Sequence, residues 1–385
     1  MNLAVLEGLD YQRICFVLLI IVAALIICLA LRTVKRVAAT ILGASILIVG
    51  TSGCNGLTNG VFPNLFNNDI DSSISSAVSD TVTNIKDSIS SAKQSIHDFD
   101  DTQSKNQVTD SASLIKRLPV VTSLPDDAVR VHYINVGQAD CELIDDNGHY
   151  ALIDCGNSDD DCIVIPYLEG LGVEKLDYFV ASHPHEDHIG CAASVLENFD
   201  CENVIVPDVS NDTVCYNKML ETIAEKGYNI ITVNSQILGT LYPLGKGTFK
   251  MMGPIAIDEN NLNNDSVVIQ YRLGAASFLF QGDAEREEEA SILEAGYDVQ
   301  STVYKVGHHG SDTSTSYPWL NAIMPQFAVI CVDSLSNLGQ QYGHPSENVI
   351  SKLMDADVMQ VYRTDINGTV VVSTDGSSIM VDTEK

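Results

Sequence analysis

Basic residues are scarce in this sequence. Its 385 residues include 21 Lys and Arg against 51 Asp and Glu, and the formal net charge is −30 at pH 7. Residues 129–385 contain 12 basic and 39 acidic side chains, a net charge of −27. Such a charge repels polyanions, which argues against a generic nucleic-acid scaffold. Binding of long DNA normally needs several Lys or Arg contacts with phosphates, and the sequence has no cluster of basic residues there.

Paired cysteine motifs are also missing. The ten cysteines include no Cys-x-x-Cys pair and no zinc-ribbon spacing. Seven of them lie in residues 141–331, an odd number, and a domain of this size needs no disulfide to hold it together. We therefore interpret these thiols mainly as small buried apolar groups, with one or two disulfides left open if the domain is extracellular.

Two long apolar runs lie close to the N-terminus. Residues 14–31 are 18 apolar residues without a charge, and at about 1.5 Å per residue they approach the ~30 Å hydrocarbon core of a bilayer. Residues 37–50 form a second run after Arg32, Lys35 and Arg36. Two such runs around a basic loop predict a helical hairpin, and the positive-inside rule keeps that loop in the cytoplasm.

The second run has two other interpretations. With its basic flank it resembles a signal peptide, and the sequence from Thr51 to Cys54 resembles a bacterial lipoprotein cleavage site. Thr51 departs from that pattern, which usually has Leu, Val or Ile there. All three interpretations make residues 1–53 a membrane anchor at the cell membrane and place the following chain outside the cell.

Residues 54–125 are expected to be a polar linker. The segment is rich in Ser, Asp, Asn and Thr, and it offers too little apolar area to offset the entropy of ordering. One stretch, residues 78–96, repeats apolar side chains in steps of four and three. It predicts either a short coiled coil that forms a homo-oligomer, or an amphipathic helix on its own domain or on the membrane.

From residue 126 onward, strand-like and helix-like segments alternate. The expected strands cover residues 129–136, 141–144, 150–153, 176–181, 203–206, 267–272, 277–281, 303–306, 327–332, 358–362 and 369–373. The expected helices cover residues 163–171, 216–226, 285–294 and 347–356. Mixed elements with many local hairpins indicate an α/β (α+β) domain, residues 126–385, of two sheets with helices outside, a layered αββα body.

A metal-binding pattern follows the expected strand 176–181. His183, His185, Asp187 and His188 form the sequence H-x-H-x-D-H. Four such side chains within six residues suit neither a core nor a helix, whereas a loop around cations needs them. His183 and His185 project to one side for one metal, and Asp187 and His188 turn towards a second. Imidazole with carboxylate suits Zn or Mn.

Two later elements extend this set. Asp283 follows an apolar strand at the start of a helix, where a carboxylate can bridge two cations, although a helix N-cap is the alternative interpretation. His308 and His309 follow the next strand. Because side chains alternate along a strand, we expect only one of them to bind metal, and the sequence does not say which.

Six short segments then identify a family resemblance. They are Tyr133 to Asp140, Leu152 to Asn157, His183 to His188, Gln281 to Glu285, Val306 to Ser311 and Tyr342 to Pro345. In this order, across residues 131–381, they resemble the metallo-β-lactamase-fold domain of ComEC-type competence proteins. The resemblance implies an αββα sandwich and a hydrolase with two divalent metal ions that usually acts on phosphodiester bonds. In ComEC-type proteins this domain is thought to trim the DNA strand that is not transported.

Further roles are expected around the two ions. Asp187 and Asp283 would be the catalytic carboxylates beside the attacking water. Asp154 follows a strand and is expected to orient a histidine, unless it only forms a turn. The remaining candidates for substrate contact or ligand support are Asp140, Lys305, Ser311 and His344. His344 has the alternative of a structural turn before Pro345.

The sequence departs from the family pattern at several positions. Cys191 and Ala139 stand where the family usually has Gly, and no His occurs between His188 and His308. Residues 263–265 could reach the site, although a polar turn is the preferred interpretation. The residues of a ComEC channel are missing, so we expect that this chain does not itself transport DNA.

Three functions are therefore expected. The first is an anchored, outward-facing phosphodiesterase of the ComEC type. The second is a hydrolase of a small or cell-wall phosphoester, such as a phosphorylcholine or teichoic-acid-like ester. The third is a non-catalytic anchored binding module, and the intact ligand set argues against it.

Overall fold

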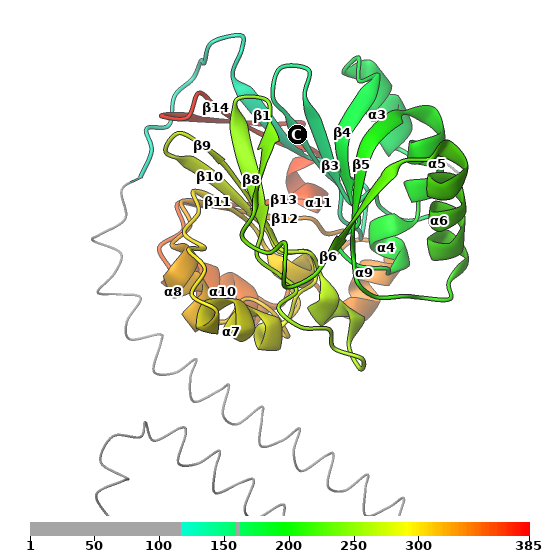
Figure 1. Cartoon of the computed structure of the whole chain (residues 1–385). Coiled ribbons are helices and arrows are strands. Elements are labelled where there is room, and N and C mark those ends of the chain that lie inside the picture. The colour runs from blue at the N-terminus through cyan, green and yellow to red at the C-terminus, as the bar shows by residue number, and fades with distance from the viewer. Residues whose placement is uncertain (1–116, 159–161) are drawn as a thin grey trace, which may run out of the picture. The chain divides into compact units, whose positions relative to one another are not determined.

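Two β-sheets lie face to face in the computed structural model, which describes residues 117–158 and 162–385 (Figure 1). Within these residues the first sheet has eight strands in the order β15-β14-β1-β2-β3-β4-β5-β6. Their bounds are β1 Val129–Tyr133, β2 Glu142–Asp145, β3 Tyr150–Ile153, β4 Lys175–Val180, β5 Asp200–Pro207, β6 Asn229–Val233, β14 Val370–Thr374 and β15 Ile379–Thr383.

The second sheet of the described residues has seven strands in the order β13-β12-β11-β10-β9-β8-β7. Their bounds are β7 Leu241–Leu244, β8 Gly247–Met251, β9 Ile269–Leu273, β10 Ala276–Phe280, β11 Val303–Lys305, β12 Phe327–Ile330 and β13 Gln360–Arg363.

Helices cover the outer faces of both sheets (Figure 1). Those that follow strands of the first sheet are α3 Val164–Gly170, α4 Glu186–Ile189, α5 Ala192–Asn198 and α6 Val214–Lys226. Those that follow strands of the second sheet are α7 Arg286–Glu294, α8 Tyr317–Ile323, α9 Asn337–Tyr342, α10 Glu347–Asp355 and α11 Thr364–Asn367. The short 3₁₀ turns are η3 Leu262–Asp265 and η4 Gly307–Gly310.

Strand alternation divides the apolar side chains among three cores. Along β4, Tyr178 and Val180 face the core between the sheets, and Phe179 faces the core under α3, α5 and α6. The same alternation in β10 sends Phe278 to the central core and Leu279 to the core under α7, α8 and α10. This is the αββα arrangement expected from the sequence, and it is confirmed.

The parallel parts of the two sheets determine where the polar motifs meet. Strands β3 to β6 pair in parallel, and so do β10 to β13. The His-rich motif follows β4, Asp283 follows β10, and the His pair follows β11. Carboxyl ends of parallel strands share one edge of a sheet, so these motifs converge between the two sheets.

Most expected elements are present, but several were missed. The expected helices and central strands match α3, α6, α7, α10 and strands β1 to β5 and β9 to β14 within a few residues. The sequence patterns did not predict β6, β7, β8, β15, α4, α5, α8, α9 or α11, and α4 forms within the His-rich motif, which was expected to be a loop. Strands β6 and β7 carry exposed apolar side chains, among them Ile230 and Leu241, so they lack the alternation that marks a strand.

Residues that precede position 126 also pack onto the domain. Leu118 is buried, and its backbone N–H donates to Oε1 of Gln326 at 2.8 Å. Val120 bridges to Ile379 in β15. All seven cysteines of the described residues are free thiols, and five are buried, as the interpretation of small apolar groups expects.

The predicted membrane anchor, the Cys54 signal and the periodic helix 78–96 lie outside the described residues. Among the residues that the structure does describe, no helix has the length and apolarity needed to cross a bilayer.

Candidate metal centre

The His-rich motif turns from strand into helix at His185. His183 lies in the extended segment after β4, and α4 carries Asp187 and His188 on its first turn. The side chains of His183 and His188 are fully buried, whereas His185 and Asp187 reach the surface of a cleft. His183 Nε2 lies 2.8 Å from His185 Nδ1, so the two imidazoles lie side by side.

Asp283 lies at the centre of the site. Its Oδ2 is 3.3 Å from His188 Nε2 and 3.9 Å from His183 Nε2, and its Oδ1 is 3.7 Å from His309 Nε2. Gly282, the preceding residue, has φ +57° and lies against Ser182 and Ser266, so a glycine is needed for this turn. Ser266 Oγ accepts the backbone N–H of Asp283 at 3.1 Å and fixes the carboxylate's position.

The histidine pair forms a strained turn in which both rings approach Asp283: His308 Nε2 lies 3.6 Å from its Oδ2, and His309 Nε2 lies 3.7 Å from its Oδ1. His308 and His309 both have left-handed backbone, with φ 49° and 52°. His309 is buried, and its Nδ1 lies 2.9 Å from the carbonyl oxygen of Cys331. A carbonyl only accepts, so Nδ1 donates and the lone pair of Nε2 is free to face the centre. His308 is 20% exposed and points its Nδ1 at Thr313 and Glu285.

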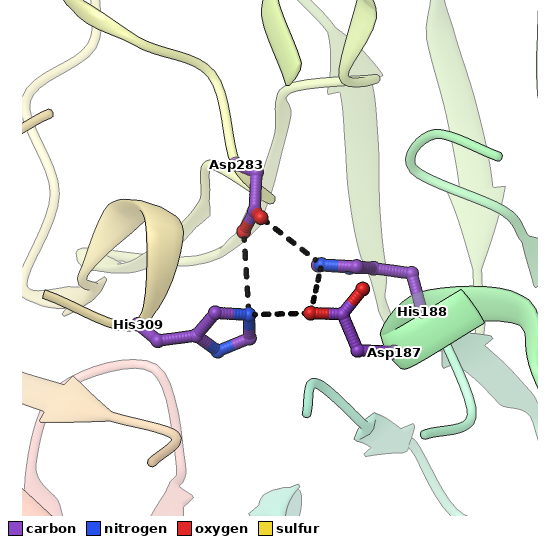
Figure 2. Close-up of side chains that lie close together, drawn as sticks. All are labelled: Asp187, His188, Asp283 and His309. Atoms are coloured by element: carbon purple, nitrogen blue, oxygen red, sulfur yellow. Dashed lines mark ion pairs between the residues drawn. The ribbon is translucent and has the colours of Figure 1, made fainter. Parts of the chain in front are cut away.

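Four ligand atoms gather in one place (Figure 2). One atom each from Asp187, His188, Asp283 and His309 lies within 4.8 Å of the others. His309 Nε2 is 3.3 Å from Asp187 Oδ2, and His188 Nε2 is 4.0 Å from the same oxygen. Figure 2 shows Asp283 entering from above, Asp187 and His188 from the right and His309 from the left.

These residues fit a cation. His188 Nε2, His309 Nε2 and Asp283 Oδ1 are buried atoms with no hydrogen-bond partner among the described residues. Buried polar atoms are rarely left unpaired, and here three of them converge on one point. Imidazole nitrogen and carboxylate oxygen are the ligands that Zn and Mn take.

The electrostatics of the cluster favour positive charge. Burial lowers the pKa of His309, but Asp140 and Asp283 outweigh it and raise the pKa to about 10. Burial also lowers the pKa of His188, but Asp283 and Asp154 outweigh it and raise that pKa well above its usual value. A site that holds protons this strongly attracts any cation, and a divalent ion can replace those protons.

Two buried carboxylates contact the Nδ1 atoms of the ligand histidines. Asp154 Oδ2 lies 2.7 Å from His188 Nδ1 and also accepts the hydroxyl of Ser182 at 2.6 Å. Asp140 Oδ1 lies 3.1 Å from His309 Nδ1, and its Oδ2 accepts from Lys305 Nζ at 2.6 Å. Both carboxylates are fully buried, so they orient the ring nitrogens and do not face the cleft.

A cleft of about 360 Å³ opens above the ligands. Its lining residues are Gln138, His185, Glu186, Asp187, Asn263, Asp283, His308, His309, Tyr342 and His344. His344 and Asn263 therefore reach the cleft, whereas Lys305 and Ser311 are buried outside its lining. Asp265 turns away and accepts the backbone N–H of Asp258 at 2.7 Å.

The sequence reasoning missed Gln138, Glu186, Glu285 and Tyr342 as residues at or beside the cleft. Each stands inside or next to a motif that was recognised, so position in the motif was the only available signal. Glu285 receives hydrogen bonds from Asn261 and Asn263, which hold it beside His308.

A comparison with family models decides the affiliation. The model of the metallo-beta-lactamase superfamily matches residues 134–332, more than half of the chain. The chain belongs to the metallo-beta-lactamase superfamily. The matched segment runs from the end of β1 to the end of β12 and contains every ligand described above.

Within this superfamily, competence proteins are among the relatives. ComE operon protein 3 of Bacillus subtilis is 29% identical over 208 residues, which cover 54% of this chain and 26% of the relative. Competence protein ComA of Neisseria gonorrhoeae is 26% identical over 252 residues, covering 64% of this chain and 33% of the relative. This chain thus spans about a quarter to a third of each relative's length. The resemblance to ComEC-type proteins is confirmed.

Solved structures also align with this metallo-beta-lactamase chain. CmlA, a diiron beta-hydroxylase from Streptomyces venezuelae, is 14% identical with a TM-score of 0.44. The alignment covers 65% of this chain and 54% of CmlA.

Proposed function

We propose that this chain is a membrane-anchored, outward-facing phosphodiesterase that uses two divalent metal ions. The observation that supports it best is the convergence of unpaired buried atoms from His188, Asp283 and His309 beside Asp187. These side chains contact one another as ion pairs, but the three atoms make no hydrogen bond among the described residues, and a cation between them would satisfy all three.

The ligands divide into two sets around Asp283. His183 and His185 form one set with Asp283, and Asp187, His188 and His309 form the other. We assign His309 rather than His308 to the second set, because only the Nε2 of His309 is buried and unpaired. Zn or Mn at these positions would supply Lewis acidity and lower the pKa of a bound water.

The chain's own residues would position the substrate. His308 faces the cleft and is held from behind by Glu285, so its ring can donate to a phosphoryl or leaving oxygen. His344 lies across the cleft, and its Nδ1 has no hydrogen-bond partner among the described residues. Asp140 and Asp154 hold His309 and His188 in the orientation that presents Nε2 to the site.

The relatives and the charge of the cleft favour different substrates. Competence proteins among the relatives support a nucleic-acid phosphodiester. The cleft, however, has no Lys or Arg in its lining, which favours a small or cell-wall phosphoester over a long polyanion. The nucleic-acid substrate and the small or cell-wall phosphoester are both phosphodiester-type substrates, so the proposed hydrolysis is the same for either.

The location of the enzyme follows from the N-terminal sequence. We propose that residues 14–31 and 37–50 anchor the chain in the cell membrane, with Cys54 as an alternative lipid attachment site. We further propose residues 78–96 as a self-association segment.

The test uses the full-length chain purified in detergent. Metal content is measured by mass spectrometry, and hydrolysis of bis-p-nitrophenyl phosphate is followed in parallel. We expect about two Zn or Mn ions per chain, as in two-metal hydrolases. Asp283→Asn should lose metal and lower turnover by roughly 100-fold or more, because even loss of a supporting residue costs about 10- to 100-fold.

The matched control is Glu202→Gln, an exposed carboxylate that pairs with Lys175 on the surface. It should leave metal content and turnover unchanged. A folded wild-type chain with neither metal nor turnover would favour the non-catalytic binding module instead. Metal without turnover would point to an ester other than a phosphodiester.

A further inference from the structure

Tyr342 has an unusual position for an aromatic residue in this protein. It is 55% exposed, and of the Phe, Tyr and Trp side chains in the described part of the chain it alone is classed as exposed. It also lines the cleft above the metal ligands. An exposed aromatic ring gains little in a free protein, so its position at a site mouth suggests a binding role.

The ring of Tyr342 continues a stack that leads into the site. It lies at 22° to the ring of His344 with a centroid distance of 5.7 Å, and His344 lies at 22° to the ring of His309 at 6.3 Å. Tyr342 is the last residue of α9, which Ser336 caps and Gly343 ends in the left-handed conformation. The ring is therefore held in place by the end of a helix and by a stacked neighbour.

The described lining of the cleft offers no Lys or Arg to the parts of a substrate that lie beyond the metal ligands. The lining contains Glu186, Asp187 and Asp283 but neither Lys nor Arg. Lys305 lies nearby, but its side chain is buried and paired with Asp140. The phosphates on either side of a bound phosphodiester would thus find no Lys or Arg partner in the lining, and part of the affinity must come from other contacts.

We propose that Tyr342 forms a subsite that stacks one nucleobase next to the phosphodiester being cleaved. The inference rests on the proposed phosphodiesterase function and narrows its substrate to nucleotides read one base at a time. Every base has a π-face, so such a subsite selects for a planar ring and tolerates different sequences. A stack of near-parallel rings is extended by a further planar ring, which favours a base over an alkyl or sugar group.

The test measures binding rather than turnover. Thymidine 5′-monophosphate and methyl phosphate, which share the phosphate and differ in the deoxyribose and the base, are titrated by calorimetry into the full-length, Mn-loaded chain. We expect thymidine monophosphate to bind roughly tenfold tighter, the order of magnitude for one base stacked on an aromatic side chain. Tyr342→Ser should abolish that preference, and Tyr342→Phe should retain it.

Methyl phosphate provides the internal control, because its affinity should be the same in wild type and both variants. Met354→Ser, which alters another exposed apolar side chain far along α10, should leave both affinities unchanged. The proposal fails if Tyr342→Ser keeps the base preference, or if wild type shows none.

A preference for phosphocholine that depends on the Tyr342 ring would also overturn the assignment, because it would make the ring a cation–π contact. The titration is independent of turnover. A chain that binds the nucleotide through Tyr342 but hydrolyses nothing would refute the phosphodiesterase and keep the subsite.

Discussion

Lys305 and Asp140 form a fully buried ion pair beneath the metal ligands. Their charged atoms are 2.6 Å apart, and neither side chain is exposed to solvent. The pair also determines the surroundings of His309, because Asp140 contacts that ring with its other oxygen. A buried charge without its partner is costly, so the two residues act as one unit.

Lys305→Met should therefore destabilise the protein by roughly 3–5 kcal/mol, the cost of leaving one buried charge unpaired. The double variant Lys305→Met with Asp140→Asn removes both charges and should recover part of that loss. Urea unfolding of the four proteins in the cycle measures both values. Additive effects of the two substitutions would show that the pair is not coupled.

His132 makes the free energy of unfolding depend on pH in the acidic range. Burial, with a smaller effect of Arg130, lowers the pKa of His132 to about 4, and its Nδ1 lies 2.8 Å from the hydroxyl of Tyr167. In the unfolded chain a histidine titrates near pH ~6.5. The unfolded state thus binds the proton first, so the free energy of unfolding is unaffected above pH ~6.5 and falls between about pH 6.5 and 4.

His132→Gln should remove this contribution, which is on the order of 2–3 kcal/mol. Denaturant unfolding at several pH values compares the variant with wild type. Wild type should lose more stability than the variant as the pH falls to about 4. Parallel curves for the two proteins would exclude His132 as the source.

The sequence predicted the types of ligand and a supporting role for Asp154 beside a histidine, but not the other supporting contacts. The H-x-H-x-D-H motif concentrates four ligands in six residues, which chance rarely produces. The choice between His308 and His309 depends on a left-handed turn and on the carbonyl of Cys331. Asp140 and Lys305 are 165 residues apart, and only the tertiary fold pairs them.

At the scale of elements, α4 depends on a close backbone contact. Gly190 follows this helix, and a Cβ there would collide with the backbone of Asn157, Ser158 and Glu186. The loop after β3 therefore packs directly on the helix that carries Asp187 and His188. Any added side chain must push these two segments apart.

Gly190→Ala should destabilise the protein by about 1–3 kcal/mol, the usual cost of overpacking, and should lower metal content. Gly170→Ala in α3 is the control, because a Cβ at Gly170 has no atom within 4 Å. Thermal unfolding and metal analysis measure both variants. Full metal content in Gly190→Ala would mean that the loop yields without moving the ligands.

The sequence predicted strands and helices correctly where a single hydrophobic periodicity dominated the segment. The buried strands β4, β10 and β12 are short apolar runs bounded by polar residues, and they were expected correctly. Strands β7 and β8 pair as a hairpin at the sheet's edge with mixed burial, so their sequence has no clear period. Their structure depends on the pairing of β7 with β8 and of β8 with β9, which a local pattern does not contain.

At the scale of the whole molecule, charge should govern how polyanions approach. Residues 129–385 carry a net charge of −27, and the described lining of the cleft contains no Lys or Arg. A protein that holds DNA through basic side chains loses affinity steeply as salt rises. Here the dominant long-range force on DNA is repulsion, and salt screens it.

The KM for single-stranded DNA should stay level or fall when NaCl is raised from about 50 to 200 mM. Steady-state kinetics on a 20-nucleotide substrate would measure this KM. Thymidine p-nitrophenyl phosphate, which has no phosphate on either side of its diester, provides the comparison. A KM that rises roughly tenfold or more would reveal a basic track outside the cleft.

The two sheets contribute different halves of the metal centre. His183 to His188 come from the first sheet, and Asp283 and His309 come from the second. A chain in which either sheet has folded without the other therefore lacks a complete ligand set. With the proposed two-metal site, only a chain in which both sheets have assembled would bind metal tightly, so metal content would distinguish native from misassembled protein.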